Sequence, residues 1–190
     1  MLDVVTLKRL IKDYRQYQEL RHQLKIPADS VRSLAKRSIV VMRQDGFEEG
    51  KRMLKDAEQL LKSVQTVLHR QPLLATEGFF KEALEEYVEA VAYYSFLTGV
   101  RMKIPSFVPL DTDEVLGGVC DFTGELVRKA MSIADARHKK EIASYIHITQ
   151  TIHGELSHIS FSGKLREKYD NLERNLVRLE RIAYEIKLKQ

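Results

Sequence analysis

The fold is decided by residues 76–101, which read TEGFFKEALEEYVEAVAYYSFLTGVR. In the first half of this stretch, apolar residues recur every three or four positions, the spacing of one face of an α-helix. From Ala90 to Val100 no charged residue occurs on any side. Because a helix that is apolar all round is buried all round, we expect this segment to lie at the centre of an all-α protein.

Working outward, the same spacing predicts further helices along the whole chain. Pro27 is expected to separate the first two of them, because proline disfavours helix in the residue before it. The predicted ranges run from Leu2 to Gln23, Asp29 or Ser30 to Arg43, Phe47 to His69, Asp111 or Thr112 to Ser132, Arg137 to Ser157, and Lys164 to Lys189. With nine Gly, four Pro and 44% apolar residues, a single α-helical domain over residues 1–190 is predicted.

The last predicted helix has an apolar stripe whose positions alternate by steps of four and three. This spacing suits packing against the chain's own helices and equally suits a partner helix in another subunit. The stripe consists of Leu165, Tyr169, Leu172, Leu176, Leu179, Ile182 and Ile186.

The charge of the chain is modest but unevenly placed. The net charge is +4, and residues 1–70 carry 15 Lys and Arg against 9 Asp and Glu. A basic excess is compatible with a polyanionic partner, although many basic proteins bind no nucleic acid. Cys120 is the only cysteine, which excludes an intramolecular disulfide and fits a reducing compartment, so we expect a cytoplasmic protein. No apolar run is long enough for a membrane span.

Two carboxylates lie where the central helix should be apolar. Glu86 and Glu89 are three residues apart and share a helix face, which Tyr93 and Phe96 continue. They therefore point toward a second buried surface. Desolvating an unpaired carboxylate costs several kcal/mol or more, so a positive partner is expected beside them.

A second acidic pair occurs in residues 115–128, VLGGVCDFTGELVR. Asp121 and Glu125 are one helical turn apart, and Gly117, Gly124 and Arg128 lie on the same side. An interior glycine costs a helix about 1 kcal/mol relative to alanine. Glycines beside two acids therefore indicate a close approach by a backbone, a ligand or a neighbouring helix.

Together these acids offer four oxygen donors from two helices, a set that Mg²⁺ or Mn²⁺ favours. Such ions activate water and stabilise the leaving oxygen in phosphodiester hydrolysis. The alternative is that Glu86 and Glu89 pair with Arg or Lys of an adjacent helix, and that Arg128 and other cations bridge Asp121 and Glu125.

Basic residues in residues 29–43 offer a surface for phosphates. Arg32, Lys36, Arg37 and Arg43 lie on this predicted helix and can neutralise an RNA backbone. An ordinary solvated face is the equally weighted alternative.

Four segments resemble the translin family: Ala35–Ile39, Leu84–Ala90, Val115–Arg128 and Leu165–Asp170. The resemblance implies a seven-helix bundle and a closed homo-oligomer, expected to be an octamer, with RNA inside. The ExxE and DxxxE pairs are similar to those of TRAX, in a compact chain like the archaeal single-gene form.

By this resemblance Glu86, Glu89, Asp121 and Glu125 are the catalytic and metal-binding residues. Lys36 and Arg37 would contact RNA, with Arg32, Arg43 and Arg128 added from the charge pattern. The expected function is a Mg²⁺-dependent endoribonuclease, with Mn²⁺ as a substitute, that cleaves mainly single-stranded RNA and has duplex RNA as a second candidate partner. The alternative is a non-catalytic oligomer that binds single-stranded RNA or DNA.

Overall fold

The computed structural model describes residues 3–188, and the regular structure of these residues is entirely helical. The elements are α1 (Val4–Arg43), α2 (Phe47–Ser63), α3 (Gln65–Arg70), the 3-10 helix η1 (Pro72–Thr76), α4 (Gly78–Thr98), α5 (Thr112–Ser132), the 3-10 helix η2 (Ala136–His138), α6 (Lys139–Leu156) and α7 (Gly163–Leu188). The predicted all-α class is confirmed. The predicted helix ends at Leu2 and Lys189 lie outside the described residues.

The predicted break before Pro27 is wrong, because α1 continues through Pro27 to Arg43. Proline has no amide hydrogen, so the carbonyl of Gln23 lacks its usual helical donor. Leu24, Ala28 and Val31 are all buried in the core, and their packing holds the helix together across this gap. The predicted helix from Phe47 to His69 is instead divided at Val64 into α2 and α3.

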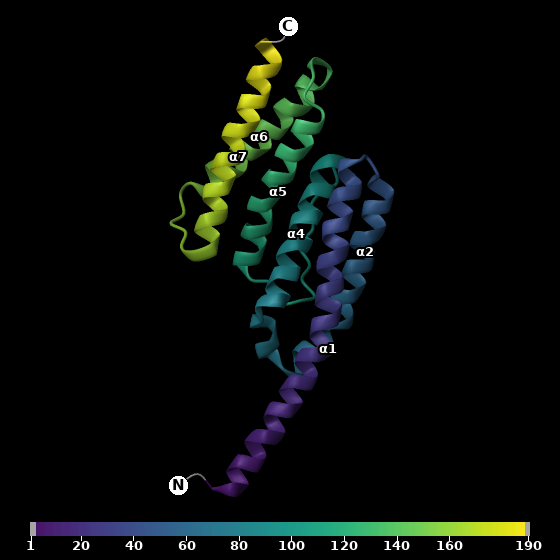
Figure 1. Cartoon of the computed structure of the whole chain (residues 1–190), viewed down its shortest axis with the longest axis vertical. Coiled ribbons are helices and arrows are strands. Elements are labelled where there is room, and N and C mark those ends of the chain that lie inside the picture. The colour runs from purple at the N-terminus through teal and green to yellow at the C-terminus, as the bar shows by residue number, and fades with distance from the viewer. Residues whose placement is uncertain (1–2, 189–190) are drawn as a thin grey trace.

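The helices pack side by side, with α4 in the middle of the molecule (Figure 1). On one side α4 packs against α1, which also packs against α2; on the other side it packs against α5. Helix α7 then covers α5 and α6. Helix α4 buries Phe80, Leu84 and Tyr93, so its predicted central position is confirmed. The prediction that residues 90–100 are buried all round is only partly right, because residues 94–98 are half-buried and Val100 is exposed.

Helix α7 uses its apolar stripe within its own chain. Tyr169, Leu172, Leu179 and Ile186 are buried, and the helices that α7 contacts are α5 and α6. Packing of the stripe against the chain's own helices is therefore confirmed, and packing against a helix of another subunit stays a prediction.

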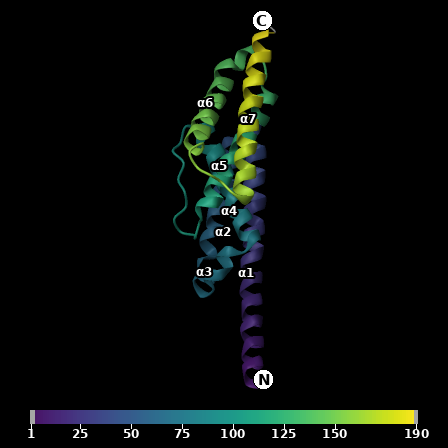
Figure 2. The same cartoon turned by 90° about the vertical axis from the view of Figure 1, so that its left-hand side faces the viewer.

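The N-terminal part of α1 extends beyond the other helices in both views (Figures 1 and 2). Its apolar residues Val4, Leu7, Ile11 and Tyr14 are exposed. Among the helices of residues 3–188, none combines the length and apolar composition needed to cross a bilayer.

Candidate active site

The backbones of α4 and α5 approach closely at the two acidic pairs. A Cβ atom on Gly118 would lie 2.7 Å from the carbonyl oxygen of Glu85 and 2.9 Å from the amide nitrogen of Glu89. A side chain at position 118 would therefore push the two helices apart. The predicted close approach is confirmed here, and the neighbour is the backbone of α4.

Gly117 and Gly124 differ in what they face. A Cβ on Gly117 would lie 2.5 Å from Glu85 Oε2 and 3.3 Å from Lys168 Cδ, so this glycine leaves room for two charged side chains. A Cβ on Gly124 would meet only Asn175, at 3.5 Å, which is an ordinary contact. Gly124 therefore does not mark a close approach, contrary to the prediction.

Three of the four predicted acids line one cavity of about 290 Å³ between α1, α4 and α5. The residues around it are Lys36, Ile39, Val40, Arg43, Glu86, Glu89, Glu125 and Arg128. Asp121 is not among them, because its carboxylate turns toward α7. The structure thus brings Glu86, Glu89 and Glu125 together and holds Asp121 to one side.

Glu86 is paired with the basic residues of α1. Its Oε1 lies 2.7 Å from Lys36 Nζ and 4.0 Å from Arg32 Nε. Both cations were predicted to bind RNA phosphates, and both already have an acidic partner within the chain. Arg37, the neighbour of Lys36, is exposed and does not line the cavity.

Glu125 is the most buried of the four acids, with only 6% of its surface exposed. Its Oε1 accepts a hydrogen bond of 2.9 Å from Arg128 Nη1. Its Oε2 is buried and accepts none; Arg43 Nε lies 3.7 Å from this oxygen, beyond hydrogen-bond distance. Burial raises the pKa of this carboxyl, and Arg128 and Arg43 counteract the rise.

Glu89 lies at the centre of the cluster and has no partner of its own. It is half-buried, and no hydrogen bond or ion pair reaches its carboxylate within residues 3–188. Burial, followed by the charges of Asp121, Glu125 and Glu86, raises the pKa of Glu89 to about 8, and the ammonium of Lys168 acts in the opposite direction.

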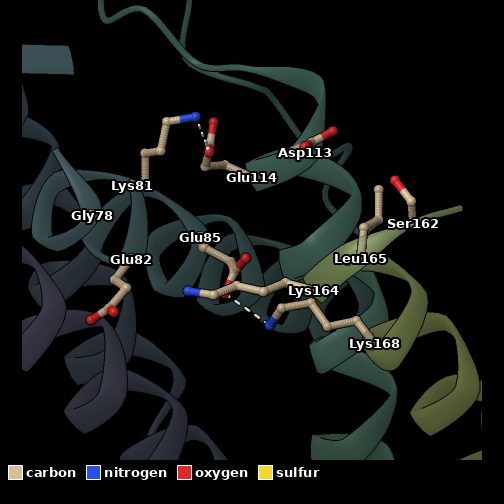
Figure 3. Close-up of a pocket in the computed structure, with 11 residues that line it drawn as sticks. Gly78, Lys81, Glu82, Glu85, Asp113, Glu114, Ser162, Lys164, Leu165 and Lys168 are labelled. Carbon is tan, nitrogen blue, oxygen red and sulfur yellow. Dashed lines mark ion pairs between the residues drawn. The ribbon is translucent and has the colours of Figure 1, made fainter. Parts of the chain in front are cut away.

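Asp121 is paired with a lysine from the opposite side of the site. Lys168 Nζ of α7 donates a hydrogen bond to Asp121 Oδ2 and lies 2.8 Å from Glu85 Oε1. Figure 3 shows the Glu85 and Lys168 side chains meeting between α4 and α7. Sequence reasoning missed the roles of both residues, because helical spacing does not reveal which face of α5 the last helix covers.

The four acids match the donor chemistry of a divalent metal site but not its geometry. All offer carboxylate oxygens, which Mg²⁺ prefers. Within residues 3–188, however, no group of three or more His, Cys, Asp or Glu side chains is arranged to hold a metal ion, because three of the acids are turned toward cations of the chain. Within the described residues, Glu89 is the one of the four acids with no hydrogen bond or ion pair, and Glu125 Oε2 is a buried oxygen that accepts no hydrogen bond.

Comparison with known protein families identifies the family of this chain. The model of the Translin family matches residues 8–190, nearly the whole sequence. The chain belongs to the translin family. A comparison with curated proteins finds no match.

This translin-family chain has the same fold as several solved structures. It superposes on AfC3PO with a TM-score of 0.87 at 22% identity, covering 97% of this chain and 98% of that one. The complex of AfC3PO with duplex RNA gives 0.84 at 20% identity and covers 97% of each chain. Apo-NeC3PO gives 0.83 at 21% identity and covers 98% of each chain. At these identities the likeness establishes the fold.

Proposed function

We propose that this translin-family protein is a Mg²⁺-dependent endoribonuclease that cleaves mainly single-stranded RNA. The observation that carries the proposal is Glu89, a half-buried carboxylate without a cation partner, beside three further acids. Ionising a carboxyl in such a place without a counter-charge costs several kcal/mol, which is why the pKa of Glu89 is raised to about 8. A divalent cation held by oxygen donors removes that cost and supplies a chemical reason for the cluster.

In this proposal Glu86, Glu89, Asp121 and Glu125 would hold the metal. Bound Mg²⁺, or Mn²⁺ in its place, would supply Lewis-acid stabilisation of charge on phosphate oxygens and lower the pKa of water. Without a bound metal ion, the negative charge of the acids would repel RNA phosphates from the cavity. A bound metal ion would neutralise the acids and remove this repulsion.

The cations around the cavity would hold the RNA backbone. Lys36 and Arg128 keep 52% and 64% of their side chains exposed, so each can turn from its carboxylate to a phosphate when the acid takes another partner. Arg43 lines the same cavity, and Arg32 and Arg37 are exposed on the same helix. The fold shared with AfC3PO, which has been solved with duplex RNA, supports an RNA partner and adds duplex RNA as a second candidate.

We further propose that the single domain assembles into a closed homo-oligomer, with an octamer as the expected form. The match to the translin family supports this assembly. A closed shell would place the cavities of several subunits around one enclosed RNA.

The first experiment is cleavage of a labelled single-stranded RNA by the purified protein in Mg²⁺ and in EDTA. We expect cutting in Mg²⁺ alone, with losses on the order of 100-fold or more in Glu89→Gln and Asp121→Asn. Glu180→Gln, which alters an exposed acid of α7 far from the cluster, serves as the matched control and should retain cleavage. Undiminished cleavage in both site variants would reject the site.

One observation favours a second function, a non-catalytic oligomer that binds single-stranded RNA or DNA. Glu86, Asp121 and Glu125 are each already neutralised by a cation of the chain, as structural acids would be. This function predicts RNA binding that weakens steeply with salt and no products in Mg²⁺.

A further inference from the structure

Lys168 reaches from α7 into the junction of α4 and α5. Its ammonium contacts Asp121 of α5 and Glu85 of α4 at the same time, so it links the three helices at the edge of the acidic cluster. Only 19% of the side chain is exposed. Its charge reaches as far as Glu89, where it favours the ionised carboxylate.

Helix α5 leaves space for the Lys168 side chain. Gly117 provides the space, because a Cβ atom there would lie 3.3 Å from Lys168 Cδ and 2.5 Å from Glu85 Oε2. A larger residue would displace both side chains. The glycine therefore serves the lysine and its second acid, Glu85, which is not one of the four proposed metal ligands.

Lys168 is less exposed than Lys36 and Arg128, the cations that pair with the other acids. Lys36 and Arg128 are more than half exposed and can move into solvent when a metal ion takes their acids. Lys168 is enclosed between helices and cannot leave so easily. It can, however, keep Glu85 as a partner when Asp121 turns away, because Glu85 Oε1 is already 2.8 Å from its ammonium.

We propose that Lys168 is a built-in counter-ion of Asp121 that a divalent cation must displace, and that Glu85 receives the displaced ammonium. Lys168 is thus a positioning residue that sets the affinity for metal. This inference rests on the proposed metal-dependent function.

The test measures Mn²⁺ binding to the full-length, RNA-free protein by electron paramagnetic resonance of the free ion. Lys168→Met should bind Mn²⁺ about tenfold tighter, because the competing charge is gone. Glu85→Gln should bind it several-fold more weakly, because Lys168 is then left with Asp121 as its sole carboxylate. Nearby charge alone would shift the affinity in these two directions, so the controls separate displacement of Lys168 from a general effect of charge.

Three controls make the result specific. Lys164→Met removes an exposed lysine one helical turn away and should leave the affinity unchanged. Adding Asp121→Asn to Lys168→Met should abolish the gain. Lys168→Gln, which keeps a hydrogen-bond donor without the charge, replaces the methionine variant if thermal unfolding shows that the latter does not fold.

Unchanged or weaker binding in Lys168→Met would overturn the inference. If Glu89→Gln and Asp121→Asn still abolish RNA cleavage in that case, the proposed function stands and the role of Lys168 alone is rejected. If neither the wild type nor any variant binds Mn²⁺, both proposals fail.

Discussion

The carboxylate of Glu89 should make the stability of the protein depend on pH. Its pKa is raised from 4.5 to about 8 in the folded chain, so the folded state binds this proton more tightly than the unfolded state. The resulting penalty is absent below about pH 4.5, grows as pH rises through the interval, and is complete above about pH 8.

Glu89→Gln, which cannot ionise, should therefore be more stable than the wild type by an amount that increases between pH 5 and pH 8. Each unit of pKa shift corresponds to about 1.4 kcal/mol, so the gain at pH 8 should reach a few kcal/mol. Urea unfolding of both proteins at pH 5, 6.5 and 8 measures this difference. If Glu89→Gln is more stable by the same amount at every pH, ionisation of Glu89 does not destabilise the folded protein.

At the scale of helices, the contact between α4 and α5 depends on Gly118. Gly118→Ala should lower the free energy of unfolding by about 1–3 kcal/mol, since the added Cβ would collide with the backbone of Glu85 and Glu89. Gly154→Ala is the matched control, because nothing lies within 4 Å of its Cβ position in α6. There the change should stabilise by up to about 1 kcal/mol. Equal effects in urea unfolding would contradict this account.

Helix α1 should gain from the loss of its interior proline. Pro27→Ala restores an amide donor for the carbonyl of Gln23 and is expected to stabilise the protein by about 1–3 kcal/mol. Urea unfolding monitored by circular dichroism measures the change. A loss of stability would mean that packing of the half-buried proline ring outweighs the missing hydrogen bond.

The sequence predicted a helix end well where a capping residue determines it. Asp111 begins α5 with the capping box that it forms with Glu114, as predicted. Helix α4 instead ends at Thr98, before the predicted Arg101, because Gly99 adopts the left-handed conformation. The break at Pro27 was mispredicted because the local preference of proline was outweighed by burial on both sides of it. Tertiary packing of this kind is not visible in the spacing of one segment.

The candidate site was predictable to the extent that its residues share a helix face. Glu86 and Glu89 meet Glu125 as the two spacings indicated. The basic residue with which each acid forms an ion pair could not be predicted from the sequence. Lys168 is 47 residues from Asp121 along the chain, and only the packing of α7 on α5 brings them together. Likewise, nothing in the sequence separated Lys36, which reaches Glu86, from its exposed neighbour Arg37.

At the scale of the whole molecule, the projecting end of α1 bears on the proposed assembly. Val4, Leu7, Ile11 and Tyr14 are exposed there at steps of three, four and three, the spacing with which helices pair. We expect a second copy of the chain to cover this stripe. Leu7→Glu combined with Ile11→Glu should therefore give smaller assemblies than the wild type in size-exclusion chromatography with light scattering.

Ile104→Glu provides the comparison for this experiment. Ile104 is 53% exposed and lies between α4 and α5, away from the end of α1. The same kind of substitution there should leave the mass unchanged. A monomeric wild-type protein would reject the proposed oligomer.

The cations that occupy the acidic cluster also bear on how the protein is made. Lys36, Arg128 and Lys168 already neutralise three of the four acids, so a newly synthesised chain can finish folding before it meets any metal. Many small metalloproteins, in contrast, unfold when a chelator removes their ion. Under the proposed function, chelation should stop RNA cleavage while the subunit stays folded, so that the supply of metal would control activity without turnover of the protein.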